Sequence, residues 1–202
     1  MSQLVTPRQI EAGFGFTLDL SSLRLTLEQF ERLCADNRDL RLELTSSGEL
    51  IVMPPTGSTT GIQNAAITRE LGNWAKKNGD GIAFDSSTAF TLPDVAIRAP
   101  DASWITSVRW ERLGEVEQEG FAPICPDFLV ELRSPADPLT TVQGKMEEYS
   151  ENGTLLGWLI DPFAHRVYVY RPSENPELLE NPEKLSGKSV LPGFVLNLRE
   201  IW

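Results

Sequence analysis

The segment Phe128-Leu129-Val130-Glu131-Leu132-Arg133 places a carboxylate inside an apolar run, and Pro100-Asp101 opens a second predicted strand that continues to Ile105. Both patterns are typical of strands, so Asp101 and Glu131 should lie at strand ends. A charged side chain is rarely placed in a hydrophobic strand without compensation, and a divalent cation can satisfy two carboxylates at once. The two segments together indicate a metal site.

The composition is that of one folded domain. The chain has 202 residues, of which 41% are hydrophobic, enough to bury one sizeable core. No apolar stretch is long enough to cross a bilayer, and the segment from Met1 to Arg8 lacks the apolar core of a signal peptide. These features predict a cytoplasmic protein with no membrane partner. Cys34 and Cys125 lie far apart without metal-ligand spacing, which favours two reduced, buried thiols over a disulfide.

The net charge and the histidine content restrict the classes of function that the chain can have. The net charge of −11 argues against a protein that coats DNA through a broad basic face, although a local basic groove is compatible with it. The single histidine, His165, excludes zinc sites and metalloprotease helices that need two imidazoles. Because the sequence has no G-x-S-x-G elbow, we interpret His165 as a surface turn residue instead of a member of a catalytic triad.

The first half of the chain mixes helices and strands. Thr26 and Gln29 form a capping-box signal for a helix to about Ala35, and apolar spacing predicts a longer helix from Ile62 to about Gly79. The acidic cluster 115–119 is interpreted as a solvated loop. Strand patterns predict a hairpin of 40–44 with 49–53, followed by neighbouring strands at 82–84, 89–92, 95–97 and 100–105.

The second half predicts a strand–helix–strand crossover. The strand that carries Glu131 is followed by a helix from about 139 to 152, with Gly153 as its C-cap, and then by a continuous apolar strand, 155–160. The latter pattern is typical of a central strand, whereas the alternation in 166–170 favours an edge strand. The tail 190–202 ends in apolar residues and is expected to dock on the core.

The order of a strand with Pro-Asp, a strand with Glu-x-Arg, and a helix with Lys-x-x-x-Tyr resembles the PD-(D/E)xK, or restriction-endonuclease-like, superfamily. More closely, the chain resembles the Uma-two family of predicted bacterial endonucleases. The matching segments are Leu42-Glu43-Leu44, Ser47-Gly48-Glu49-Leu50, Pro100-Asp101, Val130-Glu131-Leu132-Arg133-Ser134-Pro135, Lys145 with Tyr149, and Trp158-Leu159-Ile160-Asp161-Pro162.

The resemblance covers residues 26–202 and leaves 1–25 as an N-terminal arm. It implies a single α/β (α+β) domain with a mixed β-sheet flanked by helices. It also implies an endonuclease that uses Mg²⁺, or Mn²⁺ in its place, to hydrolyse phosphodiester bonds of nucleic acid, with DNA as the expected partner. A homodimer is compatible with it, since two subunits can cut both strands of a duplex.

The resemblance further implies a site in which Asp101, Glu131 and the backbone carbonyl of Leu132 hold the cation, with Glu43 completing the acidic set. The lysine of the family normally follows the second acid by two positions, where this sequence has Arg133, and arginine cannot act as a base.

Lys145 is the favoured replacement, because it lies four residues before Tyr149 and shares its helical face. In that case Arg133 could still hold a phosphate oxygen. Purely structural roles for these charged residues stay open as well. Glu131 and Arg133 could form an ordinary surface ion pair, Glu43 could face solvent, and Lys145 could pair with neighbouring glutamates on its own helix.

Two other functions remain open. The acidic charge and the missing lysine are compatible with a nuclease-like fold that acts as a non-catalytic binding or regulatory module. The small polar segment from Thr56 to Gly61, before a predicted helix, is compatible with a phosphate-binding enzyme.

Overall fold

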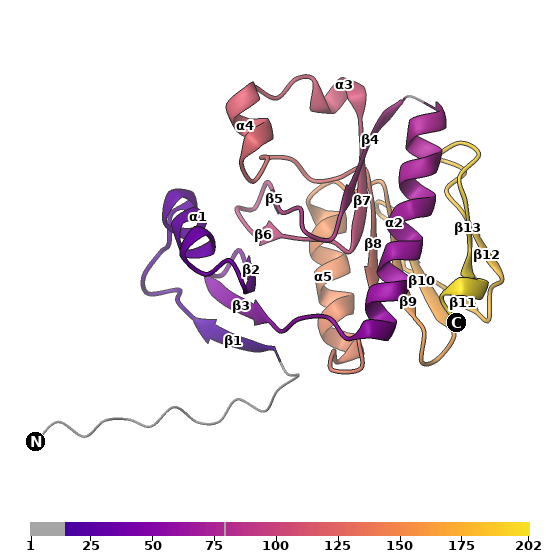
Figure 1. Ribbon diagram of the computed structural model, residues 1–202, viewed down its shortest axis with the longest axis horizontal. Coiled ribbons are helices and arrows are strands. Elements are labelled where there is room, and N and C mark those ends of the chain that lie inside the picture. Colours follow the sequence, from indigo (N-terminus) through magenta and orange to yellow (C-terminus); the bar gives the residue numbers. More distant parts are fainter. Residues whose placement is uncertain (1–14, 79) are drawn as a thin grey trace, which may run out of the picture.

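The computed structural model describes residues 15–78 and 80–202 and contains a six-stranded sheet, a five-stranded sheet and a small two-stranded one (Figure 1). In the six-stranded sheet the parallel pair β8–β9 is joined by helix α5, Leu139–Glu151, and the other pairs are antiparallel. This sheet is therefore mixed, and the predicted crossover is confirmed. Its strands in spatial order are β11 (Glu177–Glu180), β10 (Arg166–Tyr170), β9 (Leu156–Asp161), β8 (Phe128–Leu132), β7 (Ala102–Thr106) and β4 (Gly81–Asp85).

The five-stranded sheet is built around the predicted hairpin. Its order is β1 (Phe16–Asp19), β3 (Glu49–Met53), β2 (Arg41–Leu44), β6 (Ile97–Arg98) and β5 (Phe90–Thr91). Helix α1, Leu27–Asp36, begins at the predicted capping box of Thr26 and Gln29 and buries Phe30 fully. Phe30 packs with Leu42 and Leu44 of β2 in one apolar cluster, so the apolar face of β2 is directed to this core.

Helices α2, Ser58–Asn78, and α5 contribute to different cores of the six-stranded sheet. Ile67 and Leu71 of α2 share a core with Phe128 and Val130 of β8. Leu129, which lies between those two strand residues, belongs to the core that contains Met146 and Tyr149 of α5. Because side chains alternate along a strand, α2 and α5 cover opposite faces, and Glu131 lies on the face of α5.

The C-terminal segment packs on the face of the six-stranded sheet that α2 covers. Strands β12 (Lys184–Ser186) and β13 (Val195–Asn197) form a hairpin, and a 3-10 turn, Leu198–Glu200, follows. Leu198 and Ile201 are buried in the same core as α2, so the predicted docking of the tail is confirmed.

The structure corrects three expectations. Strand β10 is not an edge strand, because it pairs with both β9 and β11, and the edge is β11. The strands predicted between 82 and 105 are not all neighbours: β5 and β6 belong to the five-stranded sheet, while β4 pairs with β7. The acidic cluster forms a short exposed helix, α4 (Glu115–Glu119), after a first short helix, α3 (Ser107–Trp110).

The end of α5 and the N-terminal segment are consistent with the patterns in the sequence. Gly153, directly after the C-cap residue of α5, has φ +105°, a conformation that favours glycine. Within the predicted arm, β1 pairs with β3, while residues 1–14 lie outside the described residues. None of the helices described in residues 15–78 and 80–202 is long and apolar enough to span a membrane.

Candidate active site

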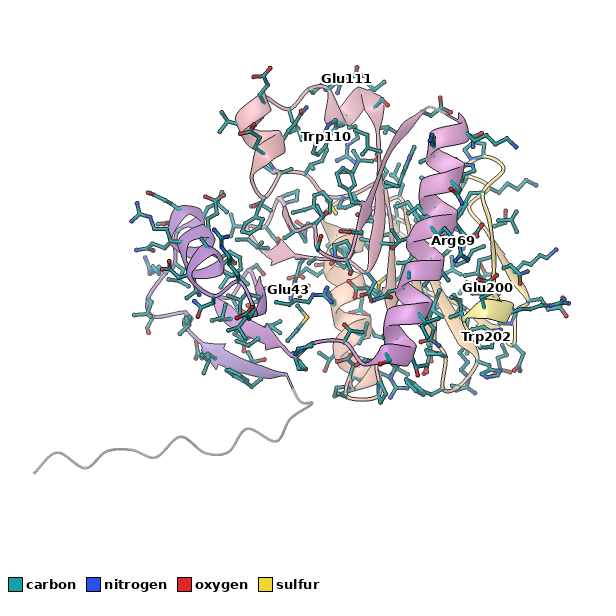
Figure 2. All side chains as sticks on the ribbon, in the orientation of Figure 1. Glu43, Arg69, Trp110, Glu111, Glu200 and Trp202 are labelled. Atoms are coloured by element: carbon teal, nitrogen blue, oxygen red, sulfur yellow. The ribbon has the colours of Figure 1, made fainter. Side chains whose placement is uncertain are left out.

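Glu43 occupies the centre of β2 with its side chain turned away from the α1 core. It is 2% exposed. One carboxylate oxygen, Oε1, accepts hydrogen bonds from Lys145 Nζ at 2.8 Å and from the Ala99 amide at 3.0 Å, and Oε2 accepts from Arg98 Nη1 at 3.1 Å. The expectation that Glu43 could simply face solvent is therefore wrong. Figure 2 shows Glu43 where the five-stranded sheet meets the rest of the molecule.

Asp101 directly precedes β7 and is fixed by two donors. Its Oδ2 accepts from the Leu132 amide at 2.8 Å, and its Oδ1 accepts from Asn64 Nδ2 at 2.9 Å. The first bond ties Asp101 to the end of β8, one residue beyond Glu131. Burial raises the pKa of the Asp101 carboxyl, and the Leu132 amide and the Lys145 ammonium oppose this shift only in part.

Glu131 projects from β8 towards α5 and is 7% exposed. Its Oε1 accepts from the Tyr149 hydroxyl at 3.1 Å and lies 2.8 Å from Lys145 Nζ. Lys145 and Tyr149 are one helical turn apart, so the predicted shared face of α5 is confirmed and is directed at Glu131. Burial and the charge of Glu131 raise the pKa of Tyr149 well above its usual value, which keeps its hydroxyl protonated as a donor.

Lys145 joins the two sheets at this point. Its ammonium lies 2.8 Å from Glu43 of the five-stranded sheet and 2.8 Å from Glu131 of the six-stranded sheet. Lys145 therefore does not pair with neighbouring glutamates on α5, as one expectation allowed. Burial alone would lower the pKa of Lys145, but Glu131 and Glu43 outweigh that effect and raise it, so the ammonium stays charged.

The two carboxylates that share Lys145 differ in their ionisation. Burial alone would raise the pKa of Glu43, but the charges of Lys145 and Arg98 lower it below its usual value. In the part of the chain that the structure describes, Glu131 has no cation other than Lys145 within ion-pair distance. Burial, together with the negative charges of Asp101 and Glu43, raises its pKa to about 7 despite Lys145. The site therefore holds more negative charge than its cations neutralise, and Glu131 takes up a proton most readily.

Arg98 and Asn64 are two contacts of the cluster that the sequence analysis missed. Arg98 on β6 is 6% exposed and pairs with both Glu43 and Glu148. No sequence signal distinguished Arg98 from a surface arginine of a short strand. The sequence does contain a signal for Asn64. It lies three residues before Ile67 and seven before Leu71, on the buried face of α2, and a polar residue is unusual on such a face.

Arg133 lies elsewhere. Its Nη1 pairs with Asp161 Oδ2 at 2.8 Å, its Nε donates to the Asp137 carbonyl at 3.0 Å, and its guanidinium lies over the Phe163 ring. The surface ion pair between Glu131 and Arg133, which the sequence left open as an alternative, is therefore not formed. Asp161 Oδ1 also accepts from the amides of Phe163 and Ala164, so Asp161 shapes the turn after β9.

A family model named Uma2, described as "Putative restriction endonuclease", matches residues 27–199. This chain belongs to the Uma2 family. The expected family is confirmed, and the comparison of structures agrees with the expected fold. A crystal structure titled as a putative nuclease belonging to DUF820, from Anabaena variabilis ATCC 29413, is similar to this Uma2 chain with a TM-score of 0.71 and 24% sequence identity. The match covers 88% of this chain and 97% of the other. No curated protein matches the chain.

The donor types of the Uma2 site fit a hydrated divalent cation better than a fully protein-ligated one. In the described part of the chain, no three carboxylate, imidazole or thiol side chains are grouped so as to hold a metal ion by themselves. Mg²⁺ does not require such a cage, since it keeps several waters and takes one or two carboxylates plus phosphate oxygens. Asp101 and Glu131 supply hard oxygens, and the buried Oδ1 of Asn64 has no hydrogen-bond partner in the structure.

The segment from Thr56 to Gly61 does not form a separate glycine loop. Helix α2 already begins at Ser58, and the Gly61 amide donates to the Gly57 carbonyl within the first helical turn. This arrangement gives no support to the phosphate-loop alternative.

Proposed function

We propose that this Uma2 chain is a metal-dependent endonuclease that hydrolyses phosphodiester bonds of nucleic acid, with DNA as its substrate. The observation that carries the proposal is the ammonium of Lys145, held 2.8 Å from both Glu43 and Glu131 beside the fixed carboxylate of Asp101. Buried carboxylates grouped with one lysine are the side chains that metal-assisted phosphodiester hydrolysis requires. The description of the family and the fold of its solved relative support the same reaction.

In this proposal Asp101, Glu131 and the carbonyl of Leu132 hold Mg²⁺ or Mn²⁺. The bound ion would polarise the scissile phosphate and make a water easier to deprotonate. Lys145 orients the attacking water and offsets negative charge on the phosphate, while Glu43 holds Lys145 from the opposite sheet. Tyr149 keeps Glu131 oriented through its hydroxyl. Lys145 thus takes the position of the missing family lysine, since Arg133 is engaged by Asp161.

The alternative is a non-catalytic binding or regulatory module. Its support is the net charge of −11 together with an arginine where the family has lysine. A homodimer, a bacterial origin and a cytoplasmic location stay predictions, and sedimentation of the purified protein would test the first of them.

The test is a plasmid-nicking assay at low salt with Mg²⁺, with Mn²⁺ and with chelator. We expect metal-dependent cleavage that is lost in Asp101→Asn and Lys145→Ala but kept in Arg133→Ala. Asp94→Asn is the matched control, because Asp94 is likewise partly buried and accepts a backbone amide, that of Ala96, outside the cluster. Circular dichroism of each variant verifies folding.

Two results would contradict this assignment. Absence of cleavage by the folded, unsubstituted protein with either metal would favour the binding module. Loss of cleavage in Arg133→Ala with retention in Lys145→Ala would reverse the roles assigned to these two side chains.

A further inference from the structure

Arg41 lies on the same face of β2 as Glu43, because the two residues are two positions apart on a strand. The intervening Leu42 and the following Leu44 pack in the α1 core, which fixes this orientation. Arg41 therefore projects towards the same side of the five-stranded sheet as the carboxylate that binds Lys145.

Within the described residues, the guanidinium of Arg41 is held at one nitrogen. Its Nη2 donates to the Ser86 carbonyl at 2.8 Å, in the turn that follows β4. That turn is itself fixed, because the Asp85 carboxylate accepts from both the amide and the hydroxyl of Ser87. A guanidinium has five N–H donors, so one anchored nitrogen leaves a planar fork that can bind another acceptor.

Among the described arginines, Arg41 combines the lack of a carboxylate partner with partial burial. Among the arginines in residues 15–78 and 80–202, four lie beyond ion-pair distance of any carboxylate, and three of these are exposed at the surface. The exposed ones are Arg24, Arg38 and Arg112. Arg41 alone in this group is partly buried, where an unpaired positive charge is less well compensated by water.

The charge of Arg41 acts on the proposed site. It lowers the pKa of the Asp101 carboxyl, against the larger opposite effect of burial, although the two side chains form no ion pair. Arg41 is thus close enough to Asp101 to interact through its charge and is free to bind an anion beside it. In a chain of net charge −11, such a local cation is needed to hold a polyanion at the site.

We propose that Arg41 binds a backbone phosphate of the nucleic-acid substrate next to the carboxylate cluster. This inference rests on the proposed endonuclease function and adds a substrate-binding residue to it. Arginine suits this role because its fork matches two phosphate oxygens and stays charged at all working pH values. The bond to Ser86 keeps the fork oriented before the substrate arrives.

The experiment measures binding without cleavage. A short fluorescein-labelled DNA duplex is titrated with the full-length protein in the presence of chelator, and fluorescence anisotropy gives the dissociation constant at several salt concentrations. Arg41→Ala should weaken binding about tenfold at low salt, as expected for the loss of one charge-assisted hydrogen-bonded contact. It should also reduce the slope of log Kd against log salt by about 1. Arg41→Lys keeps the positive charge but lacks the planar guanidinium. Its dissociation constant should lie between those of the unsubstituted protein and Arg41→Ala.

Arg112→Ala is the matched control. Arg112 is exposed and has no carboxylate partner, and Figure 2 shows its neighbour Glu111 far from Glu43. This variant should bind as the unsubstituted protein does. Thermal melting separates a structural loss from a binding loss, because a role limited to anchoring Ser86 would lower the melting temperature of Arg41→Ala without changing the salt slope.

The outcomes distinguish this inference from the proposed function. Binding by the unsubstituted protein that Arg41→Ala does not weaken would overturn the role of Arg41 and leave the endonuclease proposal standing. An equal loss in Arg112→Ala would overturn it too, since any surface charge would then suffice. Absence of binding by the unsubstituted protein would overturn the role of Arg41, whereas the endonuclease proposal is overturned only by absence of cleavage in the nicking assay with metal.

Discussion

Glu131→Gln should make the protein more stable at high pH, even though it removes a partner of Lys145. Burial and the charges of Asp101 and Glu43 raise the pKa of Glu131 from its ordinary 4.5 to about 7 in the folded protein. Between these two values the folded state binds a proton that the unfolded state has released. The free energy of unfolding of the unsubstituted protein therefore falls as pH rises through this window, and it stays low above it.

The magnitude follows from the two pKa values. Their difference, converted at about 1.4 kcal/mol per pH unit, gives a penalty of about 3 kcal/mol for ionised Glu131 above the window. Glutamine is neutral at every pH, keeps an acceptor for the Tyr149 hydroxyl and leaves Lys145 paired with Glu43. The stability advantage of the variant should thus be near zero at about pH 4 and approach 3 kcal/mol at about pH 8.

Urea unfolding without divalent cations, monitored by tryptophan fluorescence at both pH values, measures this difference. Glu180→Gln is the control, since it removes an exposed carboxylate that pairs with Arg166 at the sheet edge. A stability difference between Glu131→Gln and the unsubstituted protein that is the same at both pH values, or that shrinks as pH rises, would refute the reasoning.

Three further outcomes are expected. Arg98→Met should lower the free energy of unfolding by about 3–5 kcal/mol, because it removes the guanidinium that is shared by the buried carboxylate of Glu43 and the partly buried carboxylate of Glu148; a loss under about 1 kcal/mol in urea titration would contradict this. Gly81→Ala should destabilise by about 1–3 kcal/mol, since its Cβ would lie 2.3 Å from the Ile105 carbonyl, whereas Gly72→Ala, with open space in α2, should stabilise. Mg²⁺ should raise the thermal midpoint of the unsubstituted protein and chelator should reverse the effect; a midpoint independent of Mg²⁺ would count against the metal site.

The sequence identified the residues that meet at the site because their positions follow short-range rules. The i, i+4 spacing placed Lys145 and Tyr149 on one face, and the crossover directed that face at the strand of Glu131. The sequence alone does not predict the burial of Glu43. Alternation along β2 indicates which residues share a face of the strand but not which elements cover that face. Its burial depends on Lys145 and Arg98, which come from distant parts of the chain.

The misassigned strands have a similar cause. The alternating pattern of β10 indicates that one face of the strand is less buried than the other. It does not indicate that the strand lacks a neighbour on one side, as an edge strand does. Strand periodicity puts Arg133 on the face of Glu131, and the Arg133 amide still pairs with the Ile160 carbonyl of β9, but periodicity does not say which partners the side chains take. The Arg133 guanidinium binds Asp161, while Glu131 is engaged by Lys145 and Tyr149. Asn64 could have been singled out from the sequence, because it interrupts the apolar face of α2.

The shared salt-bridge cluster of Glu43, Arg98, Glu131 and Lys145 also restricts how the family can diverge. Removal of Glu43, Arg98 or Lys145 leaves a charge in the cluster without a partner, whereas Glu131 can lose its charge because Lys145 stays paired with Glu43. Homologues should therefore retain Glu43, Arg98 and Lys145 together or lose them together, and intermediates should be rare. A lineage without the proposed nuclease activity should show coordinated replacement at these three positions, so covariation among these alignment columns would record where in the phylogeny the proposed activity was lost.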